Sequence, residues 1–154
     1  MLRIFAASHC LLVTSALLLI YCSGSPPASI GVTGKSLAPC PTSPNCVSSD
    51  ATDAEHKAEP FMLATTPDKT WMIVKEEVRR LPRTKIIKET GSYIHAECRS
   101  AVWRFVDDLE LLLRPADNMI AFRSASRLGY SDFGVNRSRI EALRVSLKNR
   151  GAVQ

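Results

Sequence analysis

An alternating pattern in the C-terminal half constrains the fold more than any other feature. Residues 105–113 read FVDDLELLL and residues 120–127 read IAFRSASR, so polar and apolar side chains alternate through much of both runs. A two-residue period is typical of a strand with two different faces. The intervening residues 114–118, RPADN, are rich in turn formers. The pattern predicts an antiparallel hairpin.

The alternation assigns each side chain of this hairpin to a face. The apolar residues require a core face that also carries two serines: Phe105, Leu109, Leu111, Leu113, Ile120, Phe122, Ser124 and Ser126. Asp108 and Glu110 then lie on the opposite face, together with Arg123 and Arg127. We expect Arg123 to lie across the hairpin from Asp108 or Glu110, depending on the register of the strands.

The same parity places Asp107 on the core side, beside Ser124 or Ser126. An unpaired buried carboxylate costs several kcal/mol, so Asp107 needs hydrogen-bond partners. The two serine hydroxyls and the N–H groups of residues 134–136 are the nearest candidates, and we expect Asp107 to tie the hairpin to the helix that follows. The predicted structural polar network comprises Asp107, Asp108, Ser124, Ser126 and Asp132.

The remaining elements surround this hairpin. Thr66-Pro67-Asp68 is a typical helix start, and apolar residues recur at helical spacing from there until Pro82. Residues 85–90 and 92–99 read as two strands joined at Gly91, and residues 136–149 read as a second helix. The predicted fold class is α+β: a four-stranded antiparallel sheet with one helix before it and one after it, both packed on one face.

The N-terminal residues 1–24 predict a secretory signal peptide or a lipoprotein leader. Arg3 precedes an apolar run over residues 11–21, and small residues follow. The run is short for a membrane span, which needs about 20 apolar residues. Three endings stay open: lipidation at Cys22, cleavage after Gly24, or an uncleaved anchor. We expect an exported protein, periplasmic or membrane-anchored through its N-terminus and facing the periplasm.

Residues 25–39 are rich in Ser, Pro, Gly and Ala and predict a flexible tether, followed by a single domain over residues 40–150. Cys40 and Cys46 are expected to form a disulfide in an oxidising compartment. A metal site would need further ligands, and neither His56 nor His95 stands at metal-motif spacing. No metal or other cofactor is predicted. The spacing of the two cysteines also disfavours a redox role, because it is not C-x-x-C.

The run RSASRLGYSDFGVNRSR, residues 123–139, combines arginines with a strand-to-helix junction. Helix N-termini and guanidinium groups suit carboxylates, phosphates and lipid head groups. The predicted anion-binding residues are Arg123, Arg127, Asn136 and Arg137. Internal pairing of the arginines with Asp107, Asp108, Glu110 and Asp132 is the alternative.

Two further function classes stay open. A hydrolase could use His95 with Glu97 or Asp132 and a hydroxyl such as Ser131, but the chain has no G-x-S-x-G elbow and no phosphate loop. The sequence therefore favours a non-catalytic module, which could also bind another envelope protein through its polar sheet face. The net charge of +5 is mild, and without a basic stripe it does not predict nucleic-acid binding.

Several of these motifs together resemble a known family. The segments are CPTSPNCVSS from Cys40, YIHAECRS from Tyr93, RFVDDLE from Arg104 and RSASRLGYSDFGVNRSRIEALR from Arg123. They are similar to the uncharacterised family called domain of unknown function 1499, over residues 40–144. The resemblance implies a place in bacterial envelopes or in chloroplast-bearing organisms, which agrees with the leader. It implies no activity.

Overall fold

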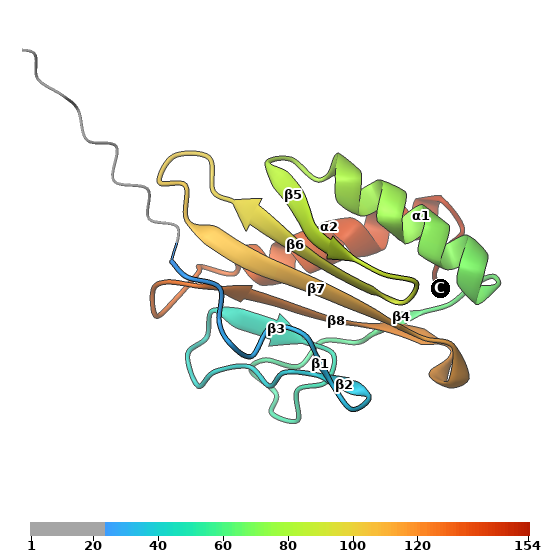
Figure 1. Ribbon diagram of the computed structural model, residues 1–154, viewed down its shortest axis with the longest axis horizontal. Coiled ribbons are helices and arrows are strands. Elements are labelled where there is room, and N and C mark those ends of the chain that lie inside the picture. Colours follow the sequence, from blue (N-terminus) through green and yellow to red (C-terminus); the bar gives the residue numbers. More distant parts are fainter. Residues whose placement is uncertain (1–23) are drawn as a thin grey trace, which may run out of the picture.

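The computed structural model of this protein describes residues 24–154. The predicted leader, with Arg3 and the lipidation candidate Cys22, lies outside the described residues apart from Gly24. Figure 1 shows a curved sheet with one helix behind it and a second helix at its upper right. Among residues 24–154 the strands are β1 Val32–Thr33, β2 Ser36–Leu37, β3 Cys46–Ser48, β4 Phe61–Met62, β5 Thr84–Glu89, β6 Tyr93–Arg99, β7 Val106–Arg114 and β8 Met119–Ser126. The helices are α1 Pro67–Arg80, the 3-10 helix η1 Pro115–Asp117 and α2 Val135–Asn149.

The main sheet has six strands, so the prediction of four was incomplete. The order is β3-β8-β7-β6-β5, all antiparallel, and β4 pairs with β8 as well. β3 and β4 are three and two residues long. Strands this short contain too few residues for an alternating pattern, which explains why they were missed. The four longer strands lie where the alternation predicted them.

The β7–β8 hairpin has the predicted faces and fixes the register that the sequence left open. Glu110 pairs with Arg123, and Asp107 pairs with Ser126. The turn is η1, followed by Asn118 in the left-handed conformation at φ 52°. Phe105 was expected in the core, and this was wrong: it lies outside β7, its side chain is exposed, and its N–H bonds to the Ser100 hydroxyl.

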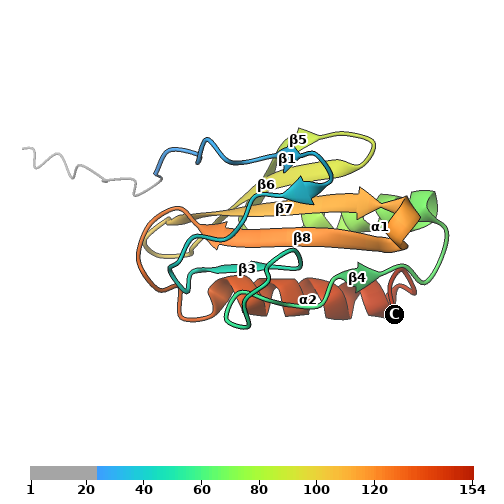
Figure 2. The same cartoon turned by 90° about the horizontal axis from the view of Figure 1, so that it is seen from below.

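Both helices pack on one face of the sheet, as predicted (Figure 2). Trp71, Val74 and Val78 of α1 are buried there, and Ile140 and Leu147 of α2 are fully buried with them. The sheet contributes Ile94, Ala96, Cys98, Leu109, Leu111, Leu113, Ile120 and Phe122 to the same core. None of the helices in residues 24–154 is long and apolar enough to cross a membrane.

The opposite face of the sheet is covered by the segment that the sequence predicts as a tether. Residues 24–39 contain the β1–β2 hairpin, which lies across β6 and β7 in Figure 2. Leu37 is buried with Tyr93, Leu112 and Ala121. The backbone N–H of Gly31 donates to the Glu110 carboxylate at 2.8 Å. Four polar residues of this face are buried: His95, Asp108, Glu110 and Arg123.

The predicted disulfide between Cys40 and Cys46 is present, with a Cα–Cα distance of 5.7 Å. It links the end of the covering segment to β3. Because the two sulfur atoms are bonded to each other, the alternative of a metal site at these cysteines is not supported. Cys98 is a buried free thiol, and burial raises its pKa.

Candidate functional site

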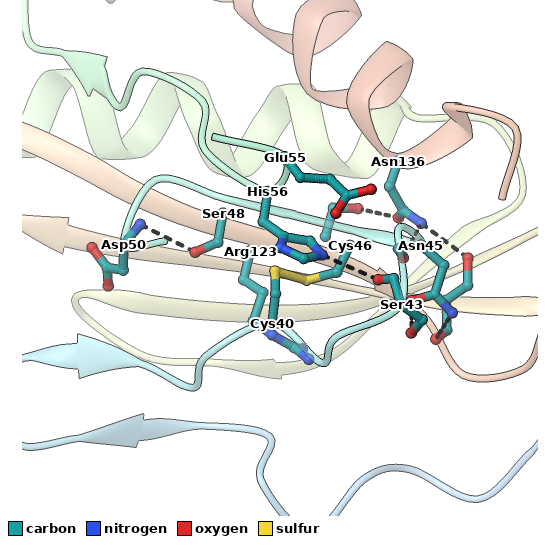
Figure 3. Close-up of a disulfide and its surroundings, with 12 residues drawn as sticks. Cys40, Ser43, Asn45, Cys46, Ser48, Asp50, Glu55, His56, Arg123 and Asn136 are labelled. Atoms are coloured by element: carbon teal, nitrogen blue, oxygen red, sulfur yellow. Dashed lines mark hydrogen bonds between the residues drawn. A yellow bond between two sulfur atoms is a disulfide. The ribbon is translucent and has the colours of Figure 1, made fainter. Parts of the chain in front are cut away.

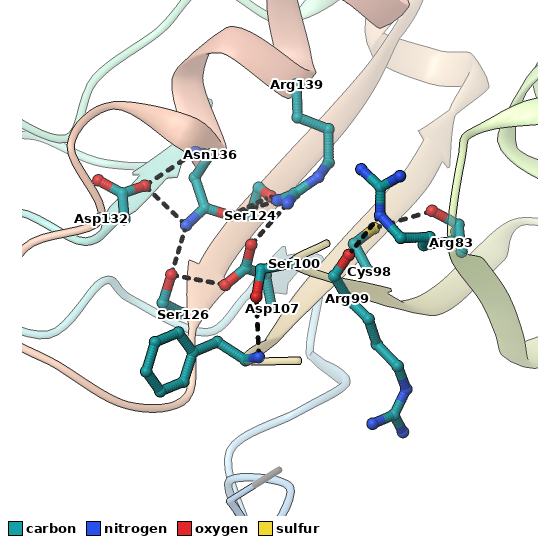
Figure 4. Close-up of polar contacts among 12 residues, drawn as sticks. Arg83, Cys98, Arg99, Ser100, Asp107, Ser124, Ser126, Asp132, Asn136 and Arg139 are labelled. Carbon is teal, nitrogen blue, oxygen red and sulfur yellow. Dashed lines mark hydrogen bonds and ion pairs between the residues drawn. The ribbon is translucent and has the colours of Figure 1, made fainter. Parts of the chain in front are cut away.

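The junction between β8 and α2 is held by a buried polar network (Figure 4). Asp107 Oδ1 accepts a hydrogen bond from the Ser126 hydroxyl at 2.6 Å, and its Oδ2 accepts one from Arg139 at 2.5 Å. Asp107 thereby links β7 to β8 and to α2. The helix contribution comes from Arg139 rather than from the backbone N–H groups that the sequence suggested. Arg139 was not predicted, although its spacing of three from Asn136 places both on one helix face.

Asn136, an expected ligand residue, is buried inside this network with 1% of its surface exposed. Its amide donates to the Asp132 carboxylate at 2.8 Å and to the Ser126 hydroxyl at 2.9 Å. Its carbonyl oxygen accepts from the Ser124 hydroxyl at 2.6 Å and from Arg139 at 2.7 Å. These contacts use the hydrogen-bonding groups of the side chain, so Asn136 has a structural role.

Asp132 covers the start of α2. Its carboxylate accepts hydrogen bonds from the backbone N–H groups of Gly134 and Asn136, at 3.0 and 2.8 Å. Burial opposes ionisation of Asp132, but these bonds outweigh it and lower the pKa of the carboxyl. The free helix N-terminus expected as an anion site is thus already occupied by a side chain of the protein.

Arg137 also bonds within the protein, although it was expected to bind a ligand. Its guanidinium donates to the carbonyl oxygens of Lys57 and Glu55, at 3.1 and 2.8 Å. It therefore attaches α2 to the loop that precedes β4.

Arg127 lies at the centre of a buried charge cluster on the other face of the sheet. It donates to Asp108 at 2.8 and 2.7 Å and to Glu97 at 2.7 Å, and 3% of its side chain is exposed. The hydrogen bond that Arg127 donates to Asp108 is the largest cause of the raised pKa of Arg127. Burial opposes ionisation of Asp108, yet Arg127 and His95 keep its pKa below the ordinary value. The cluster is consistent with the internal-pairing alternative for Arg127.

His95 and Tyr93 belong to the same cluster. The Nε2 atom of His95 lies 2.7 Å from Asp108 Oδ1, and the Tyr93 hydroxyl donates to Glu110 at 2.7 Å. Burial raises the pKa of Tyr93, and its bond to Glu110 adds to the shift.

The residues named for a hydrolase do not form one constellation. His95 bonds to Asp108, whereas Glu97 is held by Arg99 and Arg127. Asp132 is bound to the start of α2. Within residues 24–154 no serine, threonine or cysteine makes a hydrogen bond to His95, so the described contacts place no nucleophile beside this base. No cluster of three metal-ligating side chains occurs in this part of the chain either.

Arg123 differs from the other arginines of the predicted site. It is 4% exposed, and its Nη1 donates to Glu110 at 3.2 Å. Its buried Nε has no hydrogen-bond partner among residues 24–154. Arg123 lines a cavity of about 500 Å³, here called the Arg123 cavity. Figure 3 shows its side chain extending past the Cys40–Cys46 disulfide. The other lining residues include Cys40, Ser43, Asn45, Asp108 and Ser126.

A second concave region, here called the lysine cleft, was not foreseen from the sequence. It has a volume of about 530 Å³ and lies between the β1–β2 hairpin and the turn at η1. Tyr93 and Leu112 contribute apolar surface, and Lys35 and Lys88 contribute exposed cations. No signal in the sequence could have found this cleft, because it exists only where residues 31–35 fold back over the sheet.

The lowered carboxyl pKa values predict acid sensitivity. A group whose folded-state pKa is lowered stabilises the protein fully above its unfolded pKa, and this stability is lost as pH falls through the folded pKa. Asp108 and Asp132 both have pKa values below their ordinary 3.8. We expect the free energy of unfolding, measured with urea, to decrease as the pH is lowered from about 4. Asp108→Asn should make this fall shallower than in the parent chain, and equal pH profiles would contradict the assignment.

Comparison with known proteins identifies a family but adds no activity. A family model described as "Protein of unknown function (DUF1499)" matches residues 36–147. No curated protein and no solved structure matches the chain.

Proposed function

The chain belongs to DUF1499, a family of proteins of unknown function, and from this premise we propose that it is a non-catalytic module of the cell envelope that binds an anionic group at Arg123. The observation that carries the proposal is the buried Nε of Arg123, which has no partner among residues 24–154 and belongs to a side chain lining a cavity. A buried polar group without a partner costs about 1–3 kcal/mol. An acceptor oxygen in the Arg123 cavity would remove that cost.

The chemistry of the cavity favours an oxygen anion. A guanidinium group presents several N–H donors in one plane and matches carboxylate and phosphate oxygens. Arg127 is neutralised by Asp108 and Glu97, so the ligand charge would be met by Arg123 in competition with Glu110. Ser43 and Ser126 line the same cavity, but their hydroxyl protons are already donated to Asn45 and Asp107. The guanidinium of Arg123 is therefore the donor on which the proposal rests. This proposal retains Arg123 from the predicted ligand set and leaves out Arg127, Asn136 and Arg137, which bond within the protein.

An exported location fits the same proposal. The leader has the arrangement of a secretory signal, and the Cys40–Cys46 disulfide suits an oxidising compartment. A periplasmic module would meet phosphate and carboxylate groups on lipids and envelope polymers. The reaction classes that need an activated nucleophile have no support in the described contacts.

Thermal unfolding in the presence of anions tests the binding proposal. Inorganic phosphate and acetate should raise the unfolding midpoint of the full chain, since a ligand of the folded state stabilises by about 2.7 kcal/mol at 100 times its Kd. Arg123→Lys keeps the charge but loses the planar donors, and it should lose most of this shift relative to its own ligand-free midpoint. Sodium chloride at matched ionic strength controls for the screening of charges. Phosphate also stabilises proteins by exclusion from their surface, and Arg123→Lys controls for this effect, because exclusion acts equally on both chains.

Two outcomes would decide against the site. If phosphate and acetate raise the unfolding midpoint no more than sodium chloride does, the proposal of anion binding is contradicted. A shift that persists in Arg123→Lys but disappears in the double variant Lys35→Met and Lys88→Met would place the anion in the lysine cleft instead.

A further inference from the structure

One end of the sheet carries an unusual number of exposed apolar side chains. Trp103 is 71% exposed, Tyr130 is 76% exposed and Phe133 is 97% exposed. Three more exposed apolar residues come from the same two loops, residues 100–105 between β6 and β7 and residues 127–134 between β8 and α2. We call this surface the aromatic end; it comprises Val102, Trp103, Phe105, Leu128, Tyr130 and Phe133. Exposed apolar clusters of this kind mark interaction surfaces.

The two loops lie at the same end of the sheet. Arg99 of β6 pairs with Val106 of β7, and the N–H of Arg127 donates to the Val106 carbonyl at 3.1 Å. The chain therefore leaves β6 and β8 on either side of the start of β7. Figures 1 and 2 both show the two loops at the end where the N-terminal segment enters.

Phe133 has no packing role in the described part of the chain. Its φ of 54° is in the left-handed region, which a bulky side chain rarely adopts. Gly134 follows with φ 80° and leads directly into α2. The Asp132 carboxylate holds this turn by accepting from the N–H groups of Gly134 and Asn136, and the ring of Phe133 is left in solvent. The fold thus fixes the backbone beneath an uncovered phenyl ring.

The N-terminal segment enters at the aromatic end. Gly24 accepts a hydrogen bond at its carbonyl oxygen from Arg127 at 3.3 Å. A Cβ atom on Gly24 would lie 3.1 Å from the Arg127 Cβ and 3.3 Å from the Leu128 Cγ, so its backbone lies against the start of the second loop. Cys22 is two residues before Gly24, and the apolar run over residues 11–21 comes directly before that. Two residues span at most about 7 Å.

We propose that the aromatic end docks on the lipid–water interface of a bilayer, with the chain attached to that bilayer through the leader or a lipid at Cys22. Either attachment would hold the aromatic end within a short reach of the membrane surface. Tryptophan and tyrosine favour this interface, because a ring buries its apolar body while its polar atom stays in water. The partner that the aromatic end contacts is therefore the lipid surface itself. This inference concerns a different surface from the Arg123 cavity and does not depend on anion binding.

The two tryptophans of the chain allow a direct test. Trp103 is exposed and Trp71 is 3% exposed in the core. The full chain would be placed in phosphatidylcholine vesicles, with brominated acyl chains as quenchers from the lipid and iodide as a quencher from the water. A Trp103→Phe variant gives the Trp71 background to subtract. Binding of the chain to vesicles does not by itself test the proposal, because the apolar leader can bind lipid while the aromatic end stays in water.

Docking predicts that bromine quenches Trp103 and that iodide does not. The double variant Tyr130→Ser and Phe133→Ser should lose bromine quenching and gain iodide quenching. Val145→Ser is the matched control, since Val145 is 57% exposed on α2, outside the aromatic end, and should change neither readout. If iodide alone quenches Trp103 in the parent chain, the proposal is overturned, and the result would instead favour a protein partner for the aromatic end. Unchanged bromine quenching in the double variant would also overturn it.

Discussion

Replacing Arg127 with methionine is expected to lower the free energy of unfolding by about 3–5 kcal/mol, because it leaves the carboxylates of Asp108 and Glu97 without their shared partner in a buried site. Only 1% of the Asp108 side chain is exposed, so water cannot replace the lost hydrogen bonds. Urea unfolding at pH 7 measures the change. Methionine keeps much of the volume and length of the aliphatic stem, so the loss reports the charge and not a cavity.

Arg79→Met is the matched control for this substitution. Arg79 donates to Glu89 at 2.6 Å, a shorter contact than those of Arg127, but 53% of its side chain is exposed. Exposed ion pairs contribute about 0–1 kcal/mol. Similar losses in the two variants would show that the cluster around Arg127 is hydrated in solution, contrary to the burial described above.

The burial of this cluster is the part of the molecule that the sequence was least able to predict. The alternation correctly placed Asp108, Glu110, Arg123 and Arg127 on one face of the hairpin. Alternation cannot reveal whether a polar face meets water or another segment, because both arrangements share the same two-residue period. The covering segment, residues 24–39, is short of apolar residues and is held by backbone hydrogen bonds to Glu110 and Asp50, which leave no signature in composition.

The α2 junction was more accessible to sequence reasoning. Asp107 falls on the core side of a strand, so its need for a partner followed from parity alone. The partner Ser126 could be named, since it lies on the same face of the neighbouring strand. Arg139 could not, because a long side chain on a helix reaches a residue that only tertiary packing brings near. The spacing of Asn136 and Arg139 shows a shared helix face but does not say which residue that face meets.

Asp107→Ala tests whether this junction holds α2 on the sheet. The substitution leaves the Arg139 guanidinium, 14% exposed, facing the sheet with Asn136 and Ser124 as its remaining partners among residues 24–154. We expect a loss of about 3–5 kcal/mol in the free energy of unfolding, since one half of a largely buried ion pair remains. Glu141→Ala is the control on the same helix: it removes the carboxylate partner of Arg144, but Glu141 is 53% exposed and should contribute less than about 1 kcal/mol.

A double-mutant cycle separates the pair itself from the cost of an orphaned charge. Asp107→Ala combined with Arg139→Met removes both charges, so the double variant should be more stable than the sum of the two single losses predicts, by about 1–3 kcal/mol. Additive losses would mean that Asp107 and Arg139 act independently. In that case the attachment of α2 would rest on Asn136, whose hydrogen bonds to Ser124, Ser126 and Asp132 do not need the ion pair.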